Sequence, residues 1–188
     1  MIIPHGYQEA EAREYGQFET LEPGGYICKI LKATEEKAKT SGAQMLVLGL
    51  DIAEGEKTGF YRKQFDKDTR SDKKWPCLYR QLTEGNSTPY FKGMIEAIQK
   101  SNPGYTFNFD ESTLSGKLIG VVLGREQYKK QDGTLAFSVK PIRICSVDTI
   151  RAGVEPPADK LLSPTAASSV TSSQYGTAMD VDDSELPF

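Results

Sequence analysis

The stretch Met45–Ile52 constrains the fold most, because its side chains alternate with a strict period of two. One parity is apolar throughout, and it consists of Leu46, Leu48, Leu50 and Ile52. Successive side chains of a β-strand point to opposite faces of the sheet, so this pattern predicts a strand whose leucines face a core. The sequence therefore predicts a β-rich fold built around this strand.

Four more strands are expected, one before it and three after it. The first begins at Tyr26, and the others cover Phe60–Phe65, Lys117–Tyr128 and Leu135–Val147. The last two are joined by Asp132-Gly133, a dipeptide typical of tight hairpins because it tolerates positive φ angles. Glu35–Gly42 is expected to be a polar loop and Gly55–Gly59 a turn.

One main helix is expected between the third and fourth strands. Phe91, Met94, Ile95 and Ile98 recur at helical spacing after a cap at Ser87 or Thr88 and a proline, Pro89, that suits the first turn. Asn102-Pro103-Gly104 ends it. The charged connection Asp66–Asn86 precedes it, with a short helix expected over Leu78–Thr83.

Charge and composition divide the 188 residues into a body and two acidic ends. Residues 1–23 carry five acids against one base, and residues 151–188 carry six acids against two bases. Residues 24–150 hold 20 basic and 15 acidic residues, a net charge of +5. We expect an acidic lead-in (1–23), a folded body (24–151), a flexible linker rich in Pro, Ala, Ser and Thr (152–179) and an acidic tip (180–188).

The acidic tip ends on an aromatic residue. Its four acids and its apolar end are Asp180, Asp182, Asp183, Glu185, Leu186, Pro187 and Phe188. A solvated appendage is the simplest interpretation of an acidic run. A terminal ring, however, fits a small apolar pocket while carboxylates pair with basic residues around it. The tip resembles the C-terminal tip of bacterial and phage single-stranded DNA-binding proteins, which implies binding of replication or recombination proteins.

Five short motifs follow one another along the body: Pro23-Gly24-Gly25-Tyr26, Thr40-Ser41-Gly42, Leu114-Ser115-Gly116-Lys117, Asp132-Gly133 and Ile150-Arg151-Ala152-Gly153. In this order they resemble a family of phage single-stranded DNA-binding proteins that have an OB-fold, and the resemblance spans about residues 18–153. Three strands, a helix and a closing hairpin also match the OB-fold, a five-stranded Greek-key barrel. The expected fold class is all-β with one main helix.

Binding of a single strand without sequence preference needs cations along the phosphates and flat side chains that stack bases. An OB-fold presents both on its second and third strands and in the loops joining strands one to two and four to five. The candidate cations are Lys37, Lys39, Arg62, Lys63, Lys73, Lys74, Arg125, Lys129, Lys130 and Lys140. The candidate stacking rings are Tyr61, Trp75, Tyr79, Tyr128 and Phe137, for each of which core packing is the competing role. Neighbouring lysines favour base contact for Trp75 and Tyr128, whereas the sequence leaves open whether Tyr61 or Arg62 faces outward.

Catalytic sites are not expected. The sole histidine is His5, which leaves little room for a nucleophile activated by histidine. Asp66–Asp72 is not a calcium loop, because Arg70 and Ser71 stand where an oxygen ligand and a glycine are needed. We therefore expect no enzyme activity, no cofactor and no metal.

The remaining features fit a cytoplasmic protein. Cys28, Cys77 and Cys145 are odd in number and form no CxxC pair, so buried thiols in a reducing compartment are expected. No apolar run reaches the ~18 residues of a membrane span, and the first residues do not form a signal peptide. If the protein is phage-encoded, its compartment is the host bacterial cytoplasm.

The sequence thus predicts a protein that coats and protects single-stranded DNA during replication or recombination and recruits partners through its tip. The alternative is an OB-fold adaptor that binds protein or RNA, with the tip as a docking peptide. The preference for DNA or RNA and the oligomeric state stay open, with a homodimer as one option.

Overall fold

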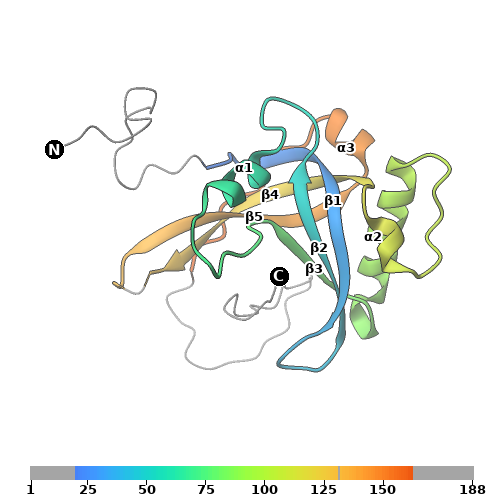
Figure 1. The fold of residues 1–188 in the computed structure, drawn as a ribbon, viewed down its shortest axis with the longest axis horizontal. Coiled ribbons are helices and arrows are strands. Elements are labelled where there is room, and N and C mark those ends of the chain that lie inside the picture. Colours follow the sequence, from blue (N-terminus) through green and yellow to red (C-terminus); the bar gives the residue numbers. More distant parts are fainter. Residues whose placement is uncertain (1–19, 131, 163–188) are drawn as a thin grey trace.

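A computed structural model describes residues 20–130 and 132–162 of the chain. The protein is mostly β, with the strands β1 (Gly24–Lys37), β2 (Gln44–Ile52), β3 (Leu78–Leu82), β4 (Leu118–Lys129) and β5 (Leu135–Cys145) (Figure 1). The helices are α1 (Phe60–Lys67), α2 (Thr88–Ser101) and α3 (Val147–Arg151), with short 3₁₀ turns η1 (Gly85–Ser87) and η2 (Glu111–Leu114). None of the helices in this described part has the length and apolarity needed to cross a bilayer.

The five strands form one antiparallel sheet in the order β3-β2-β1-β4-β5. The sheet is open, because its edges β3 and β5 are not joined by strand pairing within the described residues, although parts of them lie near each other. The β4–β5 hairpin extends to the left in Figure 1, and α2 lies on the right.

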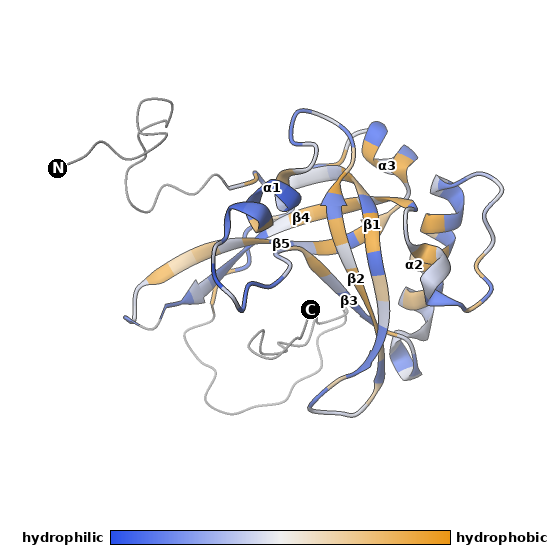
Figure 2. Ribbon diagram, in the orientation of Figure 1, coloured by the Kyte–Doolittle hydropathy of each residue, from blue (hydrophilic) through white to orange (hydrophobic). Residues whose placement is uncertain are grey.

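The core lies on one face of the sheet, which we call the inner face. The predicted alternation in β2 is confirmed, since Leu46, Leu48, Leu50 and Ile52 all belong to the core cluster. From β4, Ile119, Val121 and Leu123 join them. The predicted main helix is also confirmed: α2 buries Met94, Ala97 and Ile98 in this cluster, and Figure 2 shows its opposite side to be largely hydrophilic.

The predicted third strand is wrong, because residues 60–67 form the helix α1. Gly59 turns the chain with a φ of 70°, and the buried carboxylate of Asp51 accepts hydrogen bonds from the backbone N–H groups of Ile52 (2.9 Å) and Tyr61 (3.0 Å). Asp51 thereby satisfies an N–H group at the start of α1 that has no partner inside the helix. The helix buries Tyr61 and leaves Arg62 and Lys63 exposed.

The short helix predicted over residues 78–83 is also wrong, because Leu78–Leu82 is the strand β3. It pairs with Met45–Gly49 of β2, and so it satisfies backbone groups along that edge of β2. The main helix still lies between the third and fourth strands of the sheet, as predicted, but a different segment supplies the third strand.

The first strand is longer than predicted. β1 continues to Lys37, so Glu35–Lys37 pairs with Gln44–Leu46 instead of lying in a polar loop. An irregularity in the pairing at Leu31 shifts its register between Ile30 and Lys32. The predicted β4–β5 hairpin is confirmed, and Gly133 in its turn has a φ of 85°.

The chain beyond β5 lies against the outside of β4. α3 packs over Gly120, where an added Cβ would lie 2.6 Å from the carbonyl oxygen of Ser146 and 2.7 Å from Cγ1 of Ile150. Residues 152–162, the described part of the predicted linker, continue along β4, and Lys160 forms an isolated parallel bridge with Glu126. The body therefore extends beyond residue 151. The rest of the predicted linker and the acidic tip lie outside the described residues.

Candidate nucleic-acid interface

The outer face of β1, β2 and β3 is opposite the core. The strand registers place Thr34, Val47 and Arg80 side by side on this face, and Lys32, Gly49 and Leu78 form the neighbouring row. Val47 is only 3% exposed although it points away from the core cluster. The outer face thus has an apolar centre on β2 with basic side chains on the two flanking strands.

Trp75 lies beside this face, immediately before β3. Its Nε1–H donates a hydrogen bond to the carbonyl oxygen of Leu50 (2.8 Å), and its ring contacts Phe65 of α1 at a centroid distance of 5.3 Å. The guanidinium of Arg62 lies 5.2 Å from the Trp75 ring centroid. Lys73 lies over Phe65 (4.4 Å) and donates a hydrogen bond to its carbonyl oxygen (3.2 Å). The structure therefore brings three predicted site residues, Arg62, Lys73 and Trp75, together.

These contacts assign Trp75 a structural role as well. The ring is half-buried and packs against the core cluster, and the bond to Leu50 fixes it to β2. Of the nearby predicted cations, Lys63 is exposed on α1, and Lys74 is half-buried beside the tryptophan.

The β4–β5 hairpin carries the second group of predicted residues. Tyr128 and Phe137 are 42% and 43% exposed, and the Arg125 guanidinium lies 5.1 Å from the Phe137 ring centroid. Lys129 and Lys130 are exposed beside Tyr128. Figure 2 shows that hydrophobic residues continue along the hairpin toward its tip. Because Phe137 pairs with Gln127 and Tyr128 pairs with Ala136, the two rings point to opposite faces of the hairpin, with Arg125 and Lys129 on the Phe137 face.

Acidic neighbours moderate the charge of the hairpin. Arg125 forms a bidentate ion pair with Asp159. The carboxylate of Glu126 lies 3.8 Å from Nζ of Lys140 and 2.5 Å from Nζ of Lys160. Asp159 and Lys160 both belong to the segment along β4, so the folded chain itself supplies partners for the hairpin charges.

Two predicted stacking residues are less accessible. Tyr61 is a core residue rather than a platform for bases, since its side chain is 6% exposed. Tyr79 belongs to the inner face opposite Leu48, where burial raises its pKa and its hydroxyl donates a hydrogen bond to Gln81 (3.2 Å). The remaining predicted cations, Lys37 and Lys39, are exposed at the β1–β2 turn.

Sequence reasoning missed Lys32 and Arg80. Both occupy the outer face, but Arg80 was assigned to a helix and Lys32 follows the register shift in β1. No local signal reveals the outward Arg80, because it shares its parity with Leu78 and Leu82, which the pattern would place toward a core.

The cysteines are packing groups. Cys28 and Cys77 are buried, as predicted, whereas Cys145 is half-buried. Burial raises the pKa of Cys28 well above its usual range and that of Cys77 to about 12. The side chains of Tyr61 and Cys77 form a hydrogen bond with each other. Both buried thiols therefore stay protonated at neutral pH, which disfavours nucleophilic or metal-binding roles.

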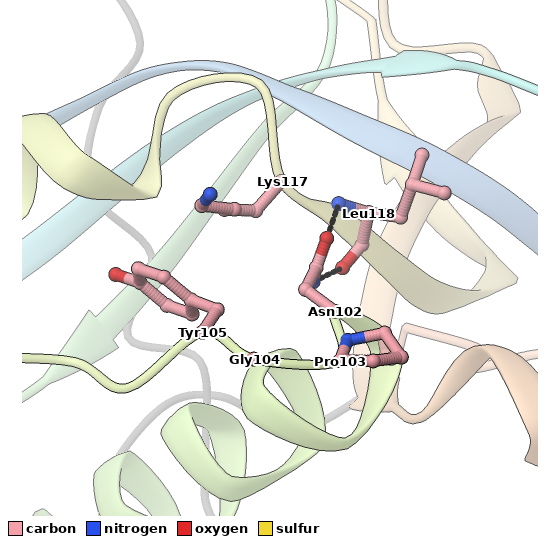
Figure 3. Close-up of a pocket in the computed structure, with 7 residues that line it drawn as sticks. Asn102, Pro103, Gly104, Tyr105, Lys117 and Leu118 are labelled. Atoms are coloured by element: carbon pink, nitrogen blue, oxygen red, sulfur yellow. Dashed lines mark hydrogen bonds between the residues drawn. The ribbon is translucent and has the colours of Figure 1, made fainter.

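A shallow pocket of about 450 Å³ lies where α2 meets the start of β4 (Figure 3). Lys117 lies over the Tyr105 ring, 4.5 Å from its centroid. The Asn102 side chain donates to the carbonyl oxygen of Leu118 (2.8 Å) and accepts from its N–H (2.9 Å), as a neighbouring strand would. These polar groups serve to hold α2 against β4.

Comparison with protein families gives a match over part of the chain. A family model described as "Protein of unknown function (DUF669)" matches residues 7–94, which include β1, β2, α1, β3 and the first half of α2. The matched part contains the outer face and Trp75, whereas the β4–β5 hairpin lies beyond it. No curated protein matches the chain.

Proposed function

We propose that the protein binds single-stranded DNA without sequence preference, through an OB-like body, and coats and protects it during replication or recombination. The observation that carries this proposal is the pair of exposed rings on the β4–β5 hairpin. Phe137 shares one face of the hairpin with Arg125 and Lys129, and Tyr128 lies on the opposite face, followed in the chain by Lys129 and Lys130. Rings that stack bases and cations that follow phosphates are the two requirements for binding a single strand.

The strand order supports an OB-like body. A five-stranded Greek-key barrel opened between its third and fifth strands has the order β3-β2-β1-β4-β5, with its helix between the third and fourth strands. In such folds the second and third strands and the hairpin between strands four and five bind nucleic acid. The outer face with Lys32 and Arg80, the Arg62–Trp75 pair and the hairpin belong to these same elements.

The acidic tip completes the proposal. Asp180, Asp182, Asp183 and Glu185 would pair with basic residues of a replication or recombination protein while Phe188 fills an apolar pocket. In a pull-down, deletion of Phe188 should remove partner capture and spare DNA binding, because it removes the apolar anchor and none of the acidic side chains. Capture of the same partners by both forms would reduce the tip to a solvated appendage.

A protein partner for the body is the second candidate. Leu135, Ile142, Leu161 and Leu162 are 47–62% exposed on β5 and on the segment beside β4, and an apolar surface of this kind is typical of protein interfaces. Gel shifts with poly-dT, duplex DNA and RNA separate the two functions. A shift with poly-dT alone supports the DNA proposal, whereas no shift with any of them favours the adaptor.

A further inference from the structure

A second cavity, of about 210 Å³, lies at the other end of the body from the hairpin residues discussed above. Its lining consists of three phenylalanines, two glutamates, a leucine and a threonine: Phe91, Phe107, Phe109, Glu35, Glu111, Leu46 and Thr83. Phe91 comes from α2 and Glu35 from β1, while Phe107, Phe109 and Glu111 belong to the loop after α2 and to η2. Its volume corresponds to roughly seven water molecules, which is room for one long side chain.

Phe109 is held in an unfavourable position at this cavity. Its backbone has a φ of 64°, a region that side chains other than those of Gly, Asn and Asp rarely adopt. Its ring is 83% exposed, so burial of the ring does not offset this strain. Hydrogen bonds fix the loop on both sides: Gln99 accepts from the Phe107 N–H (2.9 Å), and Asp110 accepts from the Ser112 N–H (3.0 Å).

The rings are arranged around the opening. Phe107 and Phe109 contact each other at a centroid distance of 5.4 Å with their planes tilted by 51°. Aromatic faces carry negative potential, so a cation is attracted to the outward faces of these two rings, which contact each other and leave no space between them. The carboxylates of Glu35 and Glu111 add negative charge at the same opening.

We infer that this cavity binds a lysine or arginine side chain from a basic segment of a partner protein. The same charges repel DNA phosphates and the protein's own acidic tip, so neither of these is the occupant. The site is therefore separate from the proposed DNA interface, and it does not depend on that proposal.

The test is an NMR titration of the full-length protein with the tripeptide acetyl-Gly-Lys-Gly-amide. Its control is the same peptide with norleucine, which keeps the aliphatic chain and lacks the charge. We expect saturable shifts of the Phe107, Phe109 and Glu111 amides with the lysine peptide at millimolar concentration, and weaker ones with norleucine. Equal shifts with both peptides, or no shifts at these amides, would overturn the inference.

Two variants assign the effect to the site. Phe109→Asn, which suits the positive φ, should weaken lysine-peptide binding about fivefold without lowering the melting temperature. The double variant Glu35→Gln with Glu111→Gln keeps the side-chain volumes and should weaken it as well. Tyr90→Ala removes an exposed ring outside the cavity and should change nothing. Unchanged affinity in both cavity variants would contradict the inference.

Discussion

The guanidinium of Arg125 is paired side-on with the carboxylate of Asp159. Nε lies 2.9 Å from Oδ1 and Nη2 lies 2.5 Å from Oδ2, while the same guanidinium lies over the Phe137 ring. This is the geometry with which arginine also binds a phosphate. Asp159 is therefore paired with a cation, Arg125, that the proposed function assigns to binding DNA phosphates.

Asp159→Asn should consequently strengthen binding of single-stranded DNA. Removing the carboxylate makes Arg125 available to a phosphate, so the slope of log affinity against log salt should steepen by roughly one. Fluorescence anisotropy of a labelled oligo-dT over a salt series measures both effects. Glu155→Gln is the matched control, since it removes one acid from the same segment at an exposed position. An equal gain in both variants would show a general charge effect instead.

The pair should withstand mild acid. Arg125 lowers the pKa of Asp159 below its usual range, so the carboxylate is ionised above the ordinary carboxyl pKa and is lost only as the pH falls through the lowered value. The difference in DNA affinity between the wild type and Asp159→Asn should then persist down to about pH 4, where an unpaired aspartate would be roughly half protonated. A difference that has already fallen by half at about pH 4 would contradict this ion pair.

Asp51 should be important for stability, because its carboxylate serves two backbone N–H groups in the interior. Asp51→Ala removes the carboxylate that accepts from the backbone N–H groups of Ile52 and Tyr61. The variant should therefore lose about 3 kcal/mol in the free energy of unfolding. Asp51→Asn keeps one oxygen and should cost less. Urea denaturation measures both, with Asp66→Ala on the exposed side of α1 as the control. Equal losses in Asp51→Ala and Asp66→Ala would contradict the capping role.

The same residue explains why part of the fold was not predictable from local pattern. Tyr61 and Phe65 share a parity, which suits a strand, but they are also four residues apart, which suits a helix face. The choice depends on Asp51, ten residues upstream, which bonds to the first turn of α1. Likewise, Leu78–Leu82 is a strand because the edge of β2, some thirty residues earlier, supplies its partner.

Elements with strong local signals were predictable. Period-two leucines defined β2, helical spacing after Pro89 defined α2, and Asp132-Gly133 defined the last hairpin. The site was predictable only where its residues follow from these elements, as for Tyr128 and Phe137 on the hairpin. The register of β3 determines that Arg80 points outward and Tyr79 inward, and no local pattern predicts that register.

Gly120 should not tolerate a side chain. A Cβ there would lie 2.6 Å from the Ser146 carbonyl oxygen, so Gly120→Ala should displace α3 and destabilise the protein by about 2 kcal/mol. Gly93→Ala is the opposite case: it lies in α2 with no atom within 4 Å of the added Cβ, and it should stabilise by about 1 kcal/mol. Thermal unfolding of the two variants should shift in opposite directions. Shifts of the same sign would contradict the close packing of α3 on β4.

Trp75 should prove to be a structural residue with an exposed partner. Trp75→Ala removes the bond to Leu50 and the contact with Phe65, and should cost about 3 kcal/mol in stability. Arg62→Ala, on the solvent side of the same pair, should leave stability nearly unchanged and weaken DNA binding. Denaturation and anisotropy of both variants make this comparison. A fully stable Trp75→Ala protein that binds DNA poorly would instead restore the sequence-based prediction that Trp75 stacks on a base.

The central claim is that the hairpin rings stack on unpaired bases, and the most direct measurement is the affinity of hairpin variants for oligo-dT and for duplex DNA of equal length. The wild type should prefer the single strand and lose affinity as salt rises. Tyr128→Ala and Phe137→Ala should each weaken oligo-dT binding by about 1–3 kcal/mol, whereas Tyr90→Ala, another exposed ring, should have no effect. Equal affinity of the wild type for single-stranded and duplex DNA, or hairpin variants that bind like Tyr90→Ala, would contradict the account.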